Sequence, residues 1–162
     1  MGEHSLTRAL RELLLARRTA ALGTRDADGE VFVSMVPFAI DPSTQELVLH
    51  VSGLAAHTGN LQRHPRVSLL VTAAETEGEP VHALPRVTLD AIAAIAEPGS
   101  EAAARARDVY LQRFPEAEMM TTLGDFRFVH LQVQGARQVA GFGAARSLPA
   151  DEVRNALAPA KE

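Results

Sequence analysis

The sequence predicts a mainly β protein with flanking helices, of the α+β class, whose antiparallel sheet closes into a barrel. Short segments rich in leucine and β-branched residues follow one another through tight turns, which is typical of hairpins. Strands and helices do not alternate regularly, so the pattern disfavours repeated βαβ units. The length of 162 residues predicts one domain over 1–162.

The first elements are a helix and a hairpin. Apolar residues recur at helical spacing after Ser5, which predicts a helix over 5–18 with Ser5 as its N-cap. Residues 19–24 form a short apolar strand, and the sequence DADG at 26–29 is typical of a turn. Residues 31–40 are long enough to be one returning strand.

The middle of the chain alternates turns, strands and one short helix. A turn at 41–44 precedes a strand at 46–51, and Ser52 is a suitable N-cap for a helix that Pro65 ends. Strands are expected at 66–72 and 86–96, separated by an exposed acidic loop at 74–80.

The last third predicts a second long helix over 100–114 and one or two strands over 126–139. Gly141 and Gly143 indicate a turn that ends a strand. The C-terminal tail, 146–162, is expected to be a weak helix or to fray.

Composition excludes several classes of function. The net charge of −4 provides no global attraction for nucleic acid or an anionic membrane surface, so neither is expected as a partner. The absence of cysteine excludes disulfides and thiolate chemistry. No apolar run is long enough to span a bilayer, and the N-terminus does not resemble a signal peptide, so the expected location is cytoplasmic.

Motifs for metal binding or nucleophilic catalysis are not found. None of the six histidines lies in a metal-binding spacing, and GxSxG, SxxK and Walker A sequences do not occur. We therefore predict no metal site and no catalytic side chain. The segment 49–61, LHVSGLAAHTGNL, clusters Ser52, His57, Thr58 and Asn60 at a helix start. Such a turn can hold a phosphate, or it can simply be a capped connection.

Eight collinear segments resemble the FMN-binding split barrel proteins related to pyridoxamine 5′-phosphate oxidase, in the branch that includes haem-utilisation proteins. They run from Arg18 to Gly143. The segments are RTAALGT at 18–24, VSMVPFA at 33–39, LAAHTGNL at 54–61, HPRVSLL at 64–70, PRVTL at 85–89, YLQRFP at 110–115, GDFRF at 124–128 and GFG at 141–143.

The resemblance implies an antiparallel split β-barrel that forms a homodimer with FMN in two clefts at the interface. The cofactor-binding residues it implies belong to a strand that faces the flavin ring, a turn that holds the phosphate and an arginine from the partner subunit. In that order they are Ser34, Met35, Val36 and Pro37; Ser52, His57, Thr58 and Asn60; and Arg86. Several of them could instead have an ordinary structural role. Ser34 could simply point outward by strand alternation, His57 could cap a turn, and Arg86 could form a surface ion pair.

Two departures from the family pattern bear on the cofactor. Gly59 stands where many relatives carry an arginine, which removes a charge-assisted phosphate contact and predicts weaker FMN binding by about 1.5 to 3 kcal/mol. Haem-utilisation members also carry a further C-terminal domain, whereas this sequence ends at Glu162, near the expected end of the barrel.

The leading hypothesis is an FMN-dependent oxidoreductase of unknown substrate, in which the cofactor supplies the redox chemistry. One alternative is a non-catalytic dimer that binds flavin or haem. Another is a haem-degrading protein, which would need His130 or His57 to face the cleft. The visible spectrum of the purified protein separates these hypotheses.

Overall fold

The computed structural model describes residues 3–159 and is built from eight strands and four α-helices with three 3₁₀ turns. The helices are α1 (Ser5–Ala16), α2 (Ala56–Arg63), α3 (Glu101–Arg113) and α4 (Ala150–Leu157). The strands are β1 (Thr19–Arg25), β2 (Val31–Pro37), β3 (Ala39–Asp41), β4 (Glu46–Ser52), β5 (Arg66–Thr72), β6 (Arg86–Ile95), β7 (Phe126–Val139) and β8 (Ala145–Pro149).

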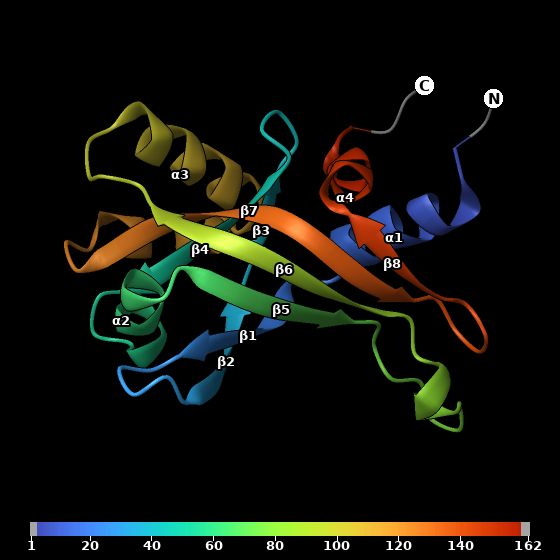
Figure 1. Cartoon of the computed structure of the whole chain (residues 1–162). Helices are drawn as coiled ribbons and strands as arrows, with labels where there is room; N and C mark the ends of the chain where they lie inside the picture. The colour runs from blue at the N-terminus through green and yellow to red at the C-terminus, as the bar shows by residue number, and fades with distance from the viewer. Residues whose placement is uncertain (1–2, 160–162) are drawn as a thin grey trace.

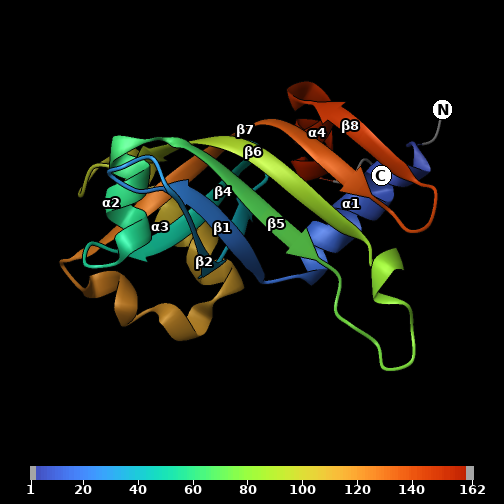
Figure 2. The same ribbon diagram turned by 60° about the horizontal axis from the view of Figure 1, so that its bottom comes forward.

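All strand pairs are antiparallel, in the order β2-β1-β5-β6-β7-β4-β3, and β8 pairs with the far part of β7. The two outermost strands, β2 and β3, are consecutive in the chain, so the sheet curves round until its edges approach each other. The helices occupy two ends of this sheet: α1 and α4 lie together at one end, and α2 and α3 lie at the other (Figures 1 and 2). The predicted mainly β, α+β fold is confirmed.

The prediction of one strand over 31–40 is wrong, because the chain changes partner at Phe38. Before Phe38, β2 pairs with β1; after it, β3 pairs with β4. Phe38 itself is fully buried, and its backbone N–H donates to the Arg18 carbonyl at 3.1 Å. A large apolar side chain therefore turns into the core at the point where the chain passes from one edge of the sheet to the other.

The predicted hairpin turns are confirmed and have clear local causes. Gly29 closes the β1–β2 turn with a φ of +80°, a conformation that glycine adopts without strain. The β3–β4 turn is organised by the buried carboxylate of Asp41, whose Oδ1 accepts from the Ser43 hydroxyl at 2.6 Å and the Ser43 N–H at 3.0 Å.

The hydrophobic core has two parts, one on each side of β4 and β7. The inner faces of the curved sheet enclose leucines and valines that also contact α1 and α4. The opposite face of β4 and β7 packs beneath α3 with an aromatic cluster of Tyr110, Phe114 and Phe128. Alternate residues of these two strands therefore belong to different clusters.

Helix ends differ from the predictions by small shifts. The N-cap of α1 is His4 rather than Ser5, since the His4 Nδ1 accepts from the Leu6 N–H at 3.2 Å. The helix ends at Ala16 instead of residue 18, and Arg113 of α3 donates to carbonyls at that end, including those of Leu14 and Leu15. Ser100 is the N-cap of α3, and its side chain accepts from the Ala103 N–H.

The C-terminal segment is more ordered than predicted. Gly141 and Gly143, both at positive φ, form the expected turn after β7, and the chain then returns as β8 along β7. The helix α4 follows and buries Val153, Ala156 and Leu157 in the core. The prediction of a weak helix or a fraying tail thus missed the strand β8; residues 160–162 lie outside the described part.

Candidate functional site

The candidate site is centred on a hydrogen-bonded pair, Ser34 on β2 and His57 on the first turn of α2. The Ser34 Oγ lies 2.9 Å from the His57 Nδ1. Ser34 points to the side of β2 that faces α2, because Val33 and Met35 on either side of it point outward and are exposed. Ser34 therefore does not alternate outward, one of the roles left open by the sequence.

The electrostatics keep this histidine neutral. Burial lowers the pKa of His57 from its ordinary value of 6.5, so the imidazole carries no charge at neutral pH. The His57 Nε2 has no hydrogen-bond partner within residues 3–159, and it is not among the fully buried unpartnered atoms. A neutral imidazole with a free nitrogen can act as a base or as a ligand to a metal centre.

The turn before α2 is held by Ser52, although not as the predicted helix cap. The helix starts at Ala56 with Ala55 in the N-cap position, so the prediction of Ser52 as N-cap is wrong. The Ser52 Oγ instead accepts from the Leu54 N–H at 3.1 Å and lies 3.4 Å from Asp125 Oδ2. A carboxylate this close disfavours a phosphate at Ser52 through like-charge repulsion.

Thr58 and Asn60 are buried and use their polar atoms within the chain. The Thr58 hydroxyl donates to the Ser52 carbonyl at 2.5 Å, and the Asn60 Nδ2 donates to the Thr24 Oγ1 at 3.1 Å. These bonds fix α2 against β4 and β1. The side chains of Thr58 and Asn60 therefore position His57. Their contact with a cofactor stays a prediction.

Gly59 is an ordinary helical residue, because its φ is not positive. A Cβ there would lie 3.5 Å from the Arg63 Nη1, which is normal van der Waals contact. The guanidinium of Arg63, one turn later in α2, thus covers the place from which an arginine at 59 would start.

The remaining predicted strand residues divide between the two faces of β2. Val36 is buried in the core, whereas Met35 is 67% exposed and Pro37 pairs with Thr19 at the end of the hairpin. Met35 is therefore the member of this group that faces outward from a single chain.

Within residues 3–159, Arg86 pairs with no surface acid. Its guanidinium donates to the carbonyls of Leu84 at 2.9 Å and His82 at 3.3 Å, in the loop that leads into β6. These bonds hold it at the opposite end of β6 from α2, so one chain does not bring Arg86 to the Ser34–His57 pair. Its expected contact from a partner subunit stays a prediction.

Two hollows border β1 and β2. One, of about 380 Å³, is lined by Val33, Met35 and Leu70 together with Arg17. The Nε of Arg17 is buried and has no partner within the described residues. This hollow therefore combines apolar walls with one arginine among its lining residues.

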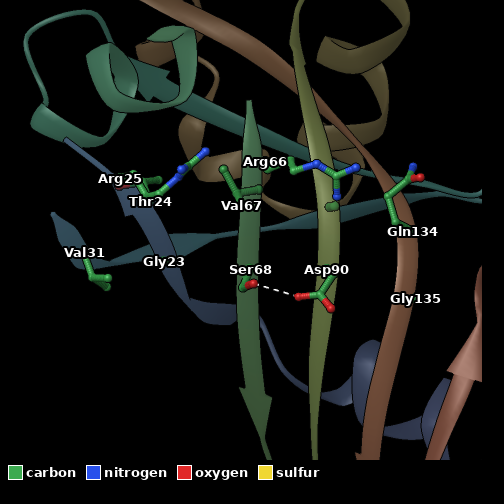
Figure 3. Close-up of a pocket in the computed structure, with 11 residues that line it drawn as sticks. Gly23, Thr24, Arg25, Val31, Arg66, Val67, Ser68, Asp90, Gln134 and Gly135 are labelled. Atoms are coloured by element: carbon green, nitrogen blue, oxygen red, sulfur yellow. Dashed lines mark hydrogen bonds between the residues drawn. The ribbon is translucent and has the colours of Figure 1, made fainter. Parts of the chain in front are cut away.

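The second hollow, of about 460 Å³, lies across β1, β5, β6 and β7 (Figure 3). Arg25 and Arg66 line it, and the Ser68 hydroxyl donates to Asp90 Oδ1 at 2.8 Å. None of the predicted cofactor residues borders it.

Two further histidines lie beneath α3, where sequence reasoning did not place them. His50 and His130 are each 8% exposed. The His130 Nε2 lies 3.3 Å from the Ala102 carbonyl, and its Nδ1 lies 3.9 Å from Glu46. Of the two histidines considered for a haem site, His130 is thus covered by α3, whereas His57 is half-buried on the first turn of α2. Residues two positions apart in a strand share a face, so the alternation of His50 with the apolar Val48 is the sequence signal that could have indicated this burial.

Comparison with known proteins assigns the family. A sequence model described as pyridoxamine 5′-phosphate oxidase matches residues 6–140. The chain belongs to this family. Among curated relatives, it is 32% identical over 145 residues to "Heme oxygenase HutZ" of Vibrio cholerae, covering 89% of this chain and 81% of that protein.

Solved structures of the family agree with the fold. A heme binding protein from Mycobacterium smegmatis is 28% identical, with a TM-score of 0.83 over 96% of this chain and 62% of that one. The structure of HutZ from Vibrio cholerae is described as that of a heme storage protein. It has 32% identity and a TM-score of 0.72 over 78% of this chain and 89% of that one. The chain thus spans less than two thirds of the mycobacterial protein. The predicted split barrel of this family is confirmed.

No helix within residues 3–159 is both long enough and apolar enough to cross a membrane.

Proposed function

We propose that this protein binds haem as a homodimer and takes part in haem storage or haem breakdown. The observation that carries the proposal is the outward face of the edge strand β2, where exposed apolar side chains line a hollow that Arg17 also borders. Two similar proteins, one described as a heme oxygenase and one as a heme binding protein, support the same cofactor.

The residues present fit haem in three respects. Porphyrin is a large apolar plane, and Val33, Met35 and Leu70 provide exposed apolar side chains. Its propionates are carboxylates, and Arg17, whose guanidinium could pair with a carboxylate, lines the same hollow. The hollow also extends from β2 across β1 to β5, since Ala21 and Leu70 line it too, which gives a planar molecule a broad surface. Bound haem would supply the redox and oxygen chemistry, and the chain would bind and orient it.

A second copy of the chain is the partner that the exposed face of β2 favours. Val31, Val33 and Met35 are 79%, 63% and 67% exposed, and they follow one another along one face of the strand. A contiguous apolar stripe of this kind is typical of an interface. An isologous dimer would cover the stripe and complete a cleft along β2 from two chains.

FMN, the cofactor of the leading sequence hypothesis, fits the same residues less well. Ser52 lies beside the Asp125 carboxylate, and the side chains of Thr58 and Asn60 donate hydrogen bonds within the chain. A phosphate there would have few free donors. The membership in a family named after an oxidase is what favours FMN, so it stands as the second candidate.

The test is a titration of the purified protein with haemin and, separately, with FMN, followed by absorbance and by sedimentation. We expect a saturable Soret band at one haem per chain, little FMN binding, and a dimer at micromolar concentration. Saturable FMN binding without a Soret change would reject haem in favour of the flavin. Failure to bind either molecule would reject both cofactors.

A further inference from the structure

A further hollow, of about 410 Å³, lies between α1 and the ends of β5, β6 and β7, and we call it the α1 hollow. Figure 2 shows α1 beside the ends of β5 and β7. One wall is a stripe of α1 at helical spacing, and the other consists of residues that follow β5, precede β6 or end β7. The first wall is Ala9, Glu12, Leu13 and Ala16, and the second is Ala73, Ala74, Pro85, Val139 and Ala140. The volume is at the lower end of the range of small-molecule sites, on the order of 300 to 1,000 Å³.

The α1 hollow exists because most residues that line it have short side chains, which do not fill the space between the helix and the strand ends. The second wall is fixed by its backbone, since the Ala73 N–H donates to the Pro85 carbonyl at 2.8 Å. Gln138, which also lines the hollow, is buried and uses both ends of its amide. Its Nε2 donates to the Leu6 carbonyl at 2.9 Å, and its Oε1 accepts from the Arg146 Nε at 2.9 Å. A molecule in the hollow would therefore meet mainly apolar groups.

Arg17 supplies a positive charge to the α1 hollow. Its backbone is fixed, because its N–H donates to the Leu13 carbonyl at 3.0 Å and its carbonyl accepts from Arg113. Its half-buried guanidinium, by contrast, forms none of the ion pairs found within residues 3–159, whereas the neighbouring Arg18 pairs with Glu116 at 2.9 Å. A guanidinium can donate two parallel hydrogen bonds to one carboxylate. The hollow thus combines an apolar space with a cation that has no acidic partner in the described part of the chain.

We infer that the α1 hollow binds a small monocarboxylate with an apolar body, of the medium-chain or aryl carboxylic acid class, and that Arg17 binds its carboxylate. Glu12 lines the same hollow and is exposed. Its charge favours a ligand with a single acid group, because a second carboxylate would add like-charge repulsion. The site goes beyond the proposed haem function and does not depend on it, although Arg17 also lines the hollow beside β2.

The first experiment titrates the protein, without haem, with octanoate and with its uncharged analogue octanamide in an isothermal calorimeter. We expect one octanoate per chain and about 10- to 100-fold weaker binding of octanamide, which lacks the charge that pairs with Arg17. Arg17→Gln should bind octanoate as weakly as the wild type binds octanamide. The control Arg18→Gln removes the adjacent exposed arginine and should leave the octanoate affinity unchanged. Glu12→Gln should bind octanoate at least as tightly as the wild type.

A second pair of variants decides which of the two hollows beside Arg17 the probe occupies. Ala9→Phe places a ring in the α1 hollow, and Ala21→Phe places one in the hollow beside β2. We expect Ala9→Phe to lose octanoate binding and Ala21→Phe to keep it, with thermal unfolding of each variant as the check on its fold. Amide shifts in the nuclear magnetic resonance spectrum of the wild type need no variant. Octanoate should shift the signals of residues 9–17, 73–74 and 139–140.

Each result supports or overturns the site. Equal affinities for octanoate and octanamide, or an unchanged octanoate affinity in Arg17→Gln, would overturn the role of Arg17. Octanoate binding that survives in Ala9→Phe and is lost in Ala21→Phe would place the probe beside β2 and overturn the α1 hollow as the site. No saturable octanoate binding by the wild type would overturn the inference as a whole. Because no titration contains haem, none of these failures counts against the proposed haem function, and a failure to bind haemin does not count against this site.

Discussion

His50 makes the stability of the folded protein depend on pH in a window that the structure defines. Its ring packs against Phe126 and Phe128, with centroids 4.8 and 4.5 Å away, and against Tyr110 at 5.5 Å. Its Nδ1 is buried with no partner within the described residues. Burial lowers the pKa of His50 from 6.5 to about 4, because the charged ring would have to leave water.

The sign of the effect follows from the two pKa values. Above pH 6.5 the ring is neutral in both the folded and the unfolded chain, so the full stability is present. As the pH falls from 6.5 to about 4, His50 becomes protonated in the unfolded chain but stays neutral in the folded chain. The free energy of unfolding should fall by about 1.4 kcal/mol per pH unit, or on the order of 3 kcal/mol in total, and this loss should stop below pH 4.

His50→Phe tests this directly, since a phenyl ring suits the aromatic cluster and does not titrate. Urea unfolding followed by circular dichroism at pH 7.5, 5.5 and 4.5 should show a much flatter pH dependence than the wild type. Some slope should remain, because burial also lowers the pKa of His57. His82→Ala, which removes an exposed histidine, should keep the wild-type slope. If His50→Phe keeps the full wild-type slope, the reasoning from burial is refuted.

Other substitutions follow from single contacts. Asp41→Ala removes the buried carboxylate that accepts from Ser43 and Thr44 in the β3–β4 turn and should cost about 1 to 3 kcal/mol in urea unfolding, because hydrogen bonds to a charged acceptor are lost; an unchanged midpoint would contradict the turn's role. Gly59→Ala should raise stability by about 0.5 to 1 kcal/mol because the site is helical and roomy, while Gly53→Ala should lower it because its Cβ would lie 2.7 Å from the Asp125 carbonyl. Val33→Glu should convert the proposed dimer to a folded monomer in sedimentation; a wild type that is already monomeric argues against that interface.

Features with local causes could be predicted from the sequence. The turn that Gly29 closes and the helix that Ser100 caps each depend on residues a few positions apart. The split at Phe38 could not be predicted in this way, because it depends on two strands at opposite edges of the sheet. The strand β8 was missed for a similar reason: its five residues carry little pattern, and their pairing with β7 is a tertiary choice.

In the candidate site, too, some features could be predicted from the sequence and others depend on tertiary contacts. Ser34 and His57 were both candidates from the family resemblance, but they are 23 residues apart, and their hydrogen bond depends on how α2 docks on β2. The internal use of Thr58 and Asn60 likewise depends on β4 and β1. The sequence indicated the right segments without indicating which of their polar atoms remain free.

The single residue between β2 and β3 has a consequence for how the barrel assembles. Two consecutive local hairpins, β1–β2 and β3–β4, supply strands to opposite edges of the sheet, and Phe38 alone joins them. Once both hairpins exist, no loop has to be closed to bring the edges together, so little chain entropy opposes closure at that point. The same short link leaves no slack: a shift of β2 on meeting a ligand or a partner must pull β3 and its turn with it, which makes the β3–β4 turn a natural place for a spectroscopic label that reports binding.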